Sequence, residues 1–390
     1  MKLWQKKQKL NKAVEDFTVG NDYHLDQNLV SYDCKASIAH AKMLSRIGVL
    51  SKDEEEKLVK SLKDMIELDK KGEFRIKKEQ EDSHTAIENY LVRNVGEAGK
   101  KIHTARSRND QVMAALRLYY KDKLDECREL IRGMVNSLKY FKKKKGNIKM
   151  PGFTHTRKAT PSSVGVWAEA FAASMQDNIK LLNICHCLIN QSPLGSGPGY
   201  GLPLDTDDEY TTDLLGFGRV QKKLYVQNSR GKFESSILHA LEQIMLDLSK
   251  MSSDLILFTL PELGYFEIPE EICTGSSVMP QKKNPDVLEL LRAKHNVVHS
   301  CEIQVKMIVS GLTSGYHRDL QITKEPVMKS FEITKKSLYI MGLVVSKLKV
   351  NEDKCEEGLT PEIFATEEAY KMVKKGVPFR EAYKKVSKRL

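Results

Sequence analysis

The chain has 390 residues, of which 41% are hydrophobic and 29% are charged, so a large core can form and wholesale disorder is excluded. Its formal net charge of +11 permits an acidic partner, but no arginine-rich patch with interleaved aromatic residues occurs, so we expect no nucleic-acid partner. Seven dispersed cysteines, an N-terminus without a signal peptide and the lack of any apolar run near ~20 residues predict a cytoplasmic protein with no membrane segment.

Long helices are predicted along most of the chain. Ser51 and Glu54 have the spacing of a capping box ahead of apolar residues at helical intervals. Apolar residues three or four apart over 112–141 predict one helix of about 30 residues, and the pattern recurs over 237–251. No segment alternates apolar and polar residues like a strand over any length. We therefore expect a mainly α fold of long bundled helices, whose several apolar faces favour oligomerisation.

Two features resemble functional sites but have simpler interpretations. The lysine run at 142–145 is interpreted as a solvated loop. Cys185, His186 and Cys187 lie in an apolar helical stretch, where residues i and i+2 do not share a face, so we interpret the cysteines as core residues rather than metal ligands. Zinc-ligand spacing, a phosphate-binding glycine loop and a dinucleotide fingerprint are not apparent either, so we expect neither a metal nor a cofactor.

The segment 274–286 combines a glycine, adjacent serines, two prolines, two lysines and an asparagine. Such a loop can direct backbone N–H groups and a lysine at an anion, and a serine beside those donors can act as a base. A proline-punctuated connector before a helix at Val287 explains the same segment equally well.

Three further segments carry clustered polar side chains. Residues 103–111 place serine, arginine and asparagine donors at the start of the long helix, where anions bind; a capped helix with surface arginines is the alternative. Residues 152–155 put a threonine and a histidine in a Gly/Pro loop, and a structural histidine is the alternative. Residues 316–325 are either a polar site or a solvated loop. Together these segments favour a cofactor-free site that abstracts a proton beside a carboxylate.

In order along the chain, these segments resemble motifs of the argininosuccinate lyase family in the fumarase/aspartase superfamily. TGSSVMPQKKNPD resembles the superfamily signature, and its QKKNPD form is similar to the argininosuccinate lyases. EDSHTAIE, HTARSRNDQV, SPLGSG, LLGF and GYHRDLQITKE fit the same family. The resemblance runs from about Phe17 to the C-terminal PFREAYKKV.

The resemblance implies a three-domain subunit, with an N-terminal helical domain at 1–105, a central long-helix bundle at 106–355 and a small C-terminal helical domain at 356–390. It also implies a homotetramer with a 20-helix core, in which each active site is shared between subunits. The implied reaction is the reversible β-elimination of argininosuccinate to arginine and fumarate in arginine biosynthesis.

The same resemblance implies a role for each site residue. Ser276 is the general base that removes a proton from the succinyl carbon next to a carboxylate. Lys282 and Asn284 stabilise the resulting aci-carboxylate, and His155, paired with Glu289, protonates the departing nitrogen. The implied substrate-binding residues are Asp22, His84, Ser107, Arg108, Asn109, Thr154, Tyr316, Gln321 and Lys324.

The chain departs from the family pattern at three places. It has WQKKQ at 4–8 in place of Trp-Gly-Gly-Arg-Phe, which affects the N-terminal loop. Ala105 replaces a glycine, and because alanine tolerates positive φ poorly we expect a different local backbone. Thr156 and Arg157 follow His155 where the family has Leu or Met and Gln, which is expected to alter hydrogen bonding. A lyase for another succinyl compound, or a non-enzymatic relative such as the lens δ-crystallins, remains an alternative.

Overall fold

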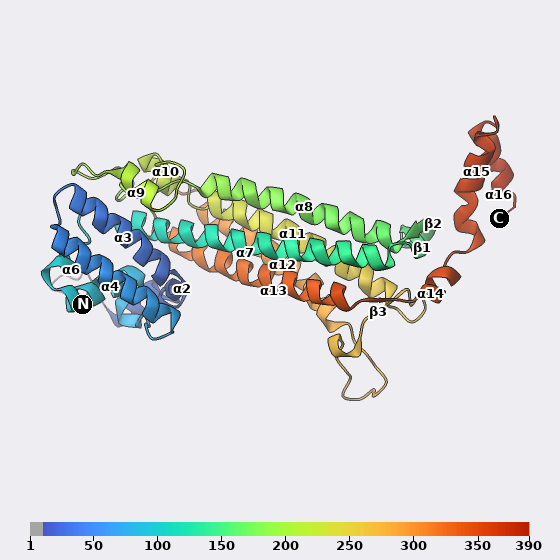
Figure 1. Cartoon of the computed structure of the whole chain (residues 1–390), viewed down its shortest axis with the longest axis horizontal. Helices are drawn as coiled ribbons and strands as arrows, with labels where there is room; N and C mark the ends of the chain where they lie inside the picture. The colour runs from blue at the N-terminus through green and yellow to red at the C-terminus, as the bar shows by residue number, and fades with distance from the viewer. Residues whose placement is uncertain (1–10, 390) are drawn as a thin grey trace. The chain divides into compact units, whose positions relative to one another are not determined.

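The computed structural model describes residues 11–389, which are mainly α-helical with four short strands (Figure 1). The predicted fold class is therefore confirmed, whereas the segment at 4–8 lies outside the described residues. Two compact units are present, and the three-domain division stays a prediction. The first unit comprises the chain up to Glu126, Leu182–His239 and Ser300–Phe331; the second comprises Cys127–Leu181, Ala240–His299 and the chain from Glu332 onward.

Five long helices each contribute a segment to both units. They are α7 (Arg108–Lys145), α8 (Val164–Ile189), α11 (Lys232–Phe258), α12 (Asp286–Val309) and α13 (Lys324–Lys347). The 38 residues of α7 include the helix predicted over 112–141, and α11 includes the helix predicted over 237–251. Pro326 lies in the first turn of α13, where a proline costs no helical hydrogen bond.

Polar contacts between α8 and α11 fix how these two helices pack in the second unit. The Trp167 indole donates to Asp254 at 3.1 Å, and one carboxylate oxygen of Asp247 accepts from both Ser174 and Asn178 at 2.7 Å. Because buried polar groups must be paired, these bonds select one register between the two helices. Burial also raises the pKa of Asp254.

Shorter helices complete the first unit. Helices α3 (Val30–Arg46), α4 (Lys52–Lys70) and α5 (Ser83–Val95) enclose an apolar core that includes Leu44, Leu58, Leu62 and Leu91. Ser51 and Glu54 form the predicted capping box at the start of α4. The short helices are α1 (Lys12–Val19), α2 (Asp22–Asp26), η1 (Gln27–Leu29), α3 (Val30–Arg46), α4 (Lys52–Lys70), η2 (Lys78–Gln80), α5 (Ser83–Val95), α6 (Glu97–Lys101), α9 (Asp208–Leu214), α10 (Lys223–Asn228) and η4 (Arg318–Thr323).

The second unit contains all four strands of the described chain. Strands β1 (Lys149–Thr154) and β2 (Arg157–Ser163) form an antiparallel hairpin whose two turn residues are His155 and Thr156. The interpretation of 152–155 as a loop is therefore wrong, because only His155 lies outside β1. The remaining elements are β3 (Phe266–Glu267), which pairs with β4 (Lys349–Val350), and the helices η3 (Glu270–Ile272), α14 (Glu352–Glu357), η5 (Pro361–Phe364), α15 (Ala365–Val373) and α16 (Phe379–Ser387).

Three other predictions need correction. The lysines at 142–145 form the last turn of α7 rather than a loop, and Lys142 pairs with Glu169 at 2.8 Å. Cys185 is buried as expected, but Cys187 is exposed. Ala105 has φ +55°, so it adopts the left-handed conformation that its Cβ was expected to disfavour.

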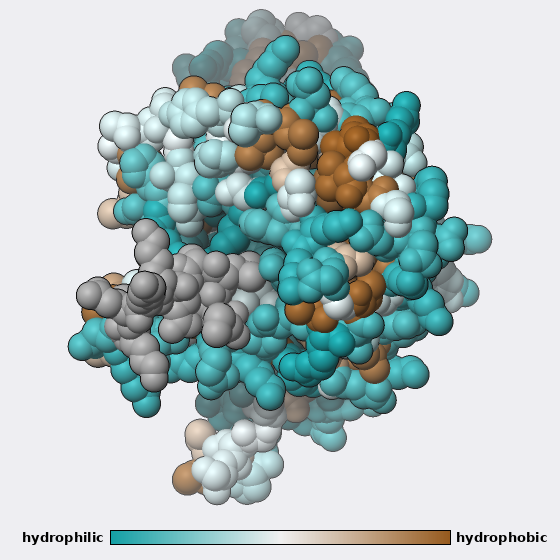
Figure 2. Space-filling model, turned by 90° about the vertical axis from the view of Figure 1, so that its left-hand side faces the viewer, coloured by the Kyte–Doolittle hydropathy of each residue, from teal (hydrophilic) through white to brown (hydrophobic). Residues whose placement is uncertain are grey.

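Hydrophobic side chains also lie on the surface. The face in Figure 2 is mostly hydrophilic, with separate hydrophobic patches. Exposed apolar side chains occur on all five long helices as well: Tyr140, Val166, Ile184, Leu246, Leu290, Ile303, Met307, Tyr339 and Leu343. Within the described chain, no helix is both long enough and apolar enough to cross a membrane.

Candidate active site

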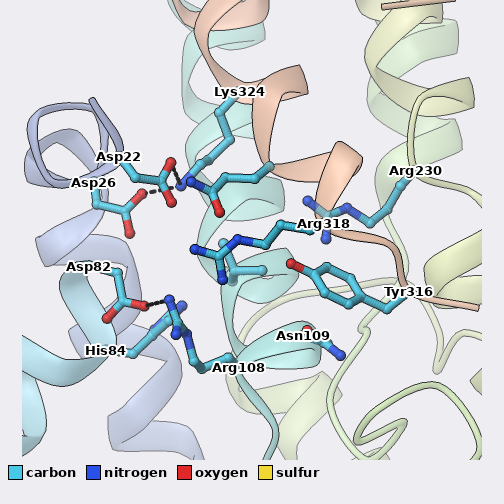
Figure 3. Close-up of a pocket in the computed structure, with 12 residues that line it drawn as sticks. Asp22, Asp26, Asp82, His84, Arg108, Asn109, Arg230, Tyr316, Arg318 and Lys324 are labelled. Atoms are coloured by element: carbon cyan, nitrogen blue, oxygen red, sulfur yellow. Dashed lines mark hydrogen bonds and ion pairs between the residues drawn. The ribbon is translucent and has the colours of Figure 1, made fainter. Parts of the chain in front are cut away.

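The first unit contains a polar pocket (Figure 3). Four cationic side chains and three aspartates line it, together with His84, Asn109, Val112, Tyr316 and Gln321. Seven of the predicted substrate-binding residues meet there: Asp22, His84, Arg108, Asn109, Tyr316, Gln321 and Lys324. The remaining two, Ser107 and Thr154, do not line it.

A buried ion triad closes one side of the pocket. The Lys324 ammonium lies 2.6 Å from a carboxylate oxygen of Asp22 and 2.6 Å from one of Asp26, as the dashed lines in Figure 3 show. Burial opposes the charge on Lys324, but the two aspartates outweigh burial and raise the pKa of the lysine. Burial also raises the pKa of Asp22, although Lys324 acts in the opposite direction. The lysine therefore stays charged and holds α13 to α2.

A second charged cluster lies at the opposite wall. Arg108 pairs with Asp82, and its other guanidinium nitrogen lies 3.5 Å from Glu81. His84 donates from Nδ1 to Asp33, and its Nε2 has no hydrogen-bond partner in the described chain. Burial opposes a charge on His84, but the Asp33 carboxylate outweighs burial and raises the pKa of the imidazole. The Nε2 atom of His84 therefore remains available to a ligand.

Two further guanidinium groups of the pocket have no carboxylate partner within residues 11–389. Arg230 is buried, donates to the Leu320 carbonyl at 3.0 Å and lies over the Tyr316 ring at 5.5 Å. Its Nε and one Nη remain without a partner in that range. Arg318 donates to the Thr18 carbonyl at 2.9 Å and lies between the two ion clusters in Figure 3. Because buried donors need partners, the unpaired nitrogens of Arg230 favour an anionic ligand, and the exposed Arg318 adds a second positive charge.

Residues just before α7 and in its first turn fix the start of that helix beside the pocket. The Asp110 carboxylate accepts from the backbone of Ser107 at 2.9 Å and of Gly197 at 2.8 Å. The Ser107 hydroxyl accepts from the Asn109 N–H at 3.3 Å, so Ser107 acts as a helix cap. The left-handed Ala105 precedes this turn.

Asp110 makes stability depend on pH. Burial raises its pKa from 3.8 to about 6, although its hydrogen bonds act against this shift. A raised carboxyl pKa means that its stabilising contribution is complete below pH 4 and is lost as the pH rises through about 6. Between these pH values, the free energy of unfolding of wild type should fall by at most about 3 kcal/mol relative to that of Asp110→Asn. Urea unfolding at each pH measures this difference. The exposed Asp213→Asn serves as the control; a parallel pH dependence in Asp110→Asn and wild type would contradict the assignment.

The segment with Ser276 is a closed loop of the second unit that projects from it in Figure 1. Backbone bonds of 3.1 and 2.8 Å between Thr274 and Asn284 join its two ends. The Ser276 hydroxyl accepts from the backbone N–H groups of Val278 at 3.3 Å and Met279 at 3.1 Å. Two such donors favour a negatively charged oxygen, which is what a serine base requires.

The other predicted catalytic residues also belong to the second unit. Lys282 is exposed, and Glu289 is exposed in the first turn of α12. His155 and Thr154 are exposed at the hairpin tip. Within the described chain, no hydrogen bond or ion pair joins His155 to Ser276 or Glu289, and Figure 1 shows the hairpin and the loop at separate places.

The pocket also contains charged residues that were not predicted. Asp82 lies in the EDSHTAIE motif and Arg318 in the GYHRDLQITKE motif, so the sequence motifs could have indicated both residues. Asp26 follows Asp22 by one helical turn, which places both on one face. Arg230 has no local signal, because only the folded chain brings it to Tyr316.

Comparisons with known proteins agree with this architecture. A family model described as Lyase matches residues 5–299. Argininosuccinate lyase of Thermotoga neapolitana is 50% identical over 389 residues, covering 100% of this chain and 98% of that protein. The enzyme of Sorangium cellulosum is 42% identical over 388 residues, covering 99% and 90%. A crystal structure of EDDS lyase with formate has a TM-score of 0.80 at 22% identity, covering 97% of this chain and 76% of that one.

The fold and these matches define a lyase of the fumarase/aspartase superfamily. Within that superfamily, the chain belongs to the argininosuccinate lyase family.

Proposed function

We propose that this enzyme cleaves argininosuccinate reversibly into arginine and fumarate, the last step of arginine biosynthesis. The observation that carries the proposal is 50% identity to an argininosuccinate lyase over 389 residues, which include every candidate catalytic position. The pocket supports it, since four cationic side chains and three carboxylates line it and the buried guanidinium of Arg230 has unused donors there. A substrate with several carboxylates satisfies those donors.

Ser276 is the proposed general base. Its hydroxyl receives two backbone hydrogen bonds, which stabilise the alkoxide and lower the cost of deprotonation. The alkoxide takes a proton from the succinyl carbon beside a carboxylate. Closure of the loop over the substrate would exclude water and strengthen these interactions.

The carbanion that results is stabilised as an aci-carboxylate. Lys282 supplies a positive charge, and Asn284, anchored through its amide to the Gly275 carbonyl at 3.2 Å, lies at the base of the same loop. Fixed donors of this kind act on charge that develops during the reaction.

His155 is the proposed acid that protonates the guanidino nitrogen as the C–N bond breaks, and Glu289 is its proposed partner. Both side chains are exposed and unpaired with each other in the single chain, so we place their contact between subunits. The apolar side chains exposed on the long helices support a homotetramer in which several subunits complete each site.

The pocket of the first unit binds the substrate in this proposal. Arg108, Asn109, Tyr316, Gln321 and Lys324 supply polar contacts there. Ser107 and Thr154 remain proposed contacts that need another subunit or a closed loop. Asp22 and His84 act through the charged clusters described above.

A cytoplasmic location is also proposed. All seven cysteines are free, as expected in a reducing compartment.

Fumarate release tests the function directly. Purified enzyme is mixed with argininosuccinate, adenylosuccinate or aspartate, and fumarate is followed by its ultraviolet absorbance. Release from argininosuccinate alone is expected. Release of fumarate from adenylosuccinate instead would assign another succinyl substrate. No release of fumarate from any of the three by a folded oligomer would favour a structural role.

Shared sites predict complementation between inactive variants. His155→Asn should lower turnover about 10²-fold or more, as loss of a general acid does. If His155 and Ser276 of one site come from different chains, a refolded mixture of His155→Asn and Ser276→Ala subunits should regain part of the activity. Mixing either variant with itself is the control. A mixture no more active than its components would place both groups on one chain.

A further inference from the structure

A buried carboxylate behind the pocket of the first unit holds His84 in place. Asp33 on α3 has a side chain that is 0% exposed, and it does not itself line the pocket. His84 on α5 does line the pocket (Figure 3), and its Nδ1 donates to Asp33 Oδ2 at 2.5 Å. We propose that Asp33 is a positioning residue, which fixes the tautomer and the orientation of His84 for binding the substrate. This proposal rests on the proposed function of the pocket.

The hydrogen bond to Asp33 decides which imidazole nitrogen carries a proton. Burial favours a neutral Asp33, but the imidazole of His84 outweighs burial and lowers the pKa of the carboxyl. An ionised carboxylate can only accept, so His84 Nδ1 must carry a proton. Nε2 is then left for a ligand, and it has no hydrogen-bond partner within residues 11–389.

Asp33 is itself held from two further positions, so it cannot turn away from His84. Its Oδ2 atom also accepts from the Ser83 hydroxyl at 2.8 Å, and its Oδ1 atom accepts from Gln111 Nε2 on α7 at 2.9 Å. Both donors are buried. An imidazole whose partner is locked in this way keeps one orientation at the pocket wall.

The same contacts tie His84 to the ion triad on the other side of the pocket. The backbone N–H of Ser83 donates to Asp26 at 3.2 Å, and Asp26 pairs with Lys324. Ser83 therefore bonds to two aspartates, one from each cluster. All of these residues belong to the first unit.

Other charged groups also act on the imidazole of His84. Burial opposes its charge, and Asp33 has the largest opposite effect, ahead of Asp82 and Asp26. The cationic or titratable groups on the neighbouring elements are Arg106, Arg108 and His103. Loss of the Asp33 charge should therefore lower the pKa of His84 although two aspartates remain.

Nitrogen NMR of the full-length enzyme with ¹⁵N-labelled histidine tests the pairing without any substrate. A comparison with His84→Gln assigns the signals of His84. In wild type, Nδ1 should keep its proton when the ring is neutral. In Asp33→Asn, the ring should titrate at lower pH. Ser37→Ala is the matched control, because it removes another buried polar group of α3, a hydrogen-bond acceptor of Arg106, and should leave the titration unchanged.

The wild-type spectrum decides the matter even if Asp33→Asn does not fold. A neutral His84 ring with its proton on Nε2 would overturn the proposal. An unchanged titration of His84 in a folded Asp33→Asn would overturn it as well.

Binding of argininosuccinate tests whether Asp33 acts through His84. Calorimetry uses the Ser276→Ala background, which lacks the proposed base. There, Asp33→Asn should weaken binding about tenfold, as loss of one hydrogen bond to a charged group does. In a background that also carries His84→Ala, the same change should have little further effect, because no imidazole is left to position. An equal loss in both backgrounds would show a merely structural role for Asp33 and overturn the proposal.

The two experiments distinguish this proposal from the proposed function. If argininosuccinate fails to bind while the NMR results are as expected, the proposed function is wrong and the positioning of His84 by Asp33 holds for another ligand. If argininosuccinate binds equally well to Asp33→Asn and to its parent, the role of Asp33 is wrong and the proposed function stands.

Discussion

Replacing Ser276 with alanine is expected to lower the turnover of argininosuccinate about 10³-fold, within the range for a lost general base. The change removes the only hydroxyl that accepts from both Val278 and Met279 in the described loop. It leaves the closure of the loop by Thr274 and Asn284 intact. Steady-state fumarate release from the purified variant measures the loss.

Ser277→Ala is the matched control, because this neighbouring serine is exposed and is not the proposed base. It should keep most of the activity. Light scattering should give the same mass for both variants and for wild type. Turnover like that of wild type in Ser276→Ala would exclude Ser276 as the base, and equal losses in both variants would point to the backbone of the loop instead.

Replacing Lys324 with methionine is expected to be among the most destabilising single changes. The ammonium lies 2.6 Å from both Asp22 and Asp26, so its removal leaves two carboxylates without their cation in a buried place. Breaking a buried ion cluster in this way typically costs about 3–5 kcal/mol of unfolding free energy. Urea unfolding followed by circular dichroism at pH 7 measures this cost.

Lys329→Met on the exposed side of the same helix provides the control and should change the free energy by no more than about 0.5 kcal/mol. The triple variant Lys324→Met, Asp22→Asn, Asp26→Asn should regain part of the loss, because it removes the uncompensated charges. Equal unfolding midpoints for Lys324→Met and wild type would show that the triad does not stabilise the fold.

The helical part of the fold was predictable because it is encoded locally. The apolar repeat over 112–141 and the pairing of Ser51 with Glu54 each depend on residues within a few turns, and both appear in α7 and α4. The hairpin of β1 and β2 was not predictable in this way. Pro151 and Gly152 are poor strand formers, and β1 shows no regular alternation of buried and exposed residues.

The pocket was predictable only in part for a related reason. Arg108, Asn109, Tyr316 and Lys324 belong to recognisable motifs, and the fold brings them together. In the ion triad, Lys324 and Asp26 are 298 positions apart in the chain, so no local sequence pattern predicts their contact. We propose that His155 meets its partners through contacts between subunits, which neither periodicity nor spacing describes.

The turn at the tip of the hairpin has a consequence for how this protein can evolve. His155 and Thr156 have φ of +52° and +55°, a geometry that favours Asn-Gly and is costly for branched or bulky side chains. The residues that would suit the turn best would remove the imidazole proposed as the acid. Selection for thermal stability and selection for turnover therefore oppose each other at this position. Mutations that raise the thermal stability have to arise elsewhere in the chain.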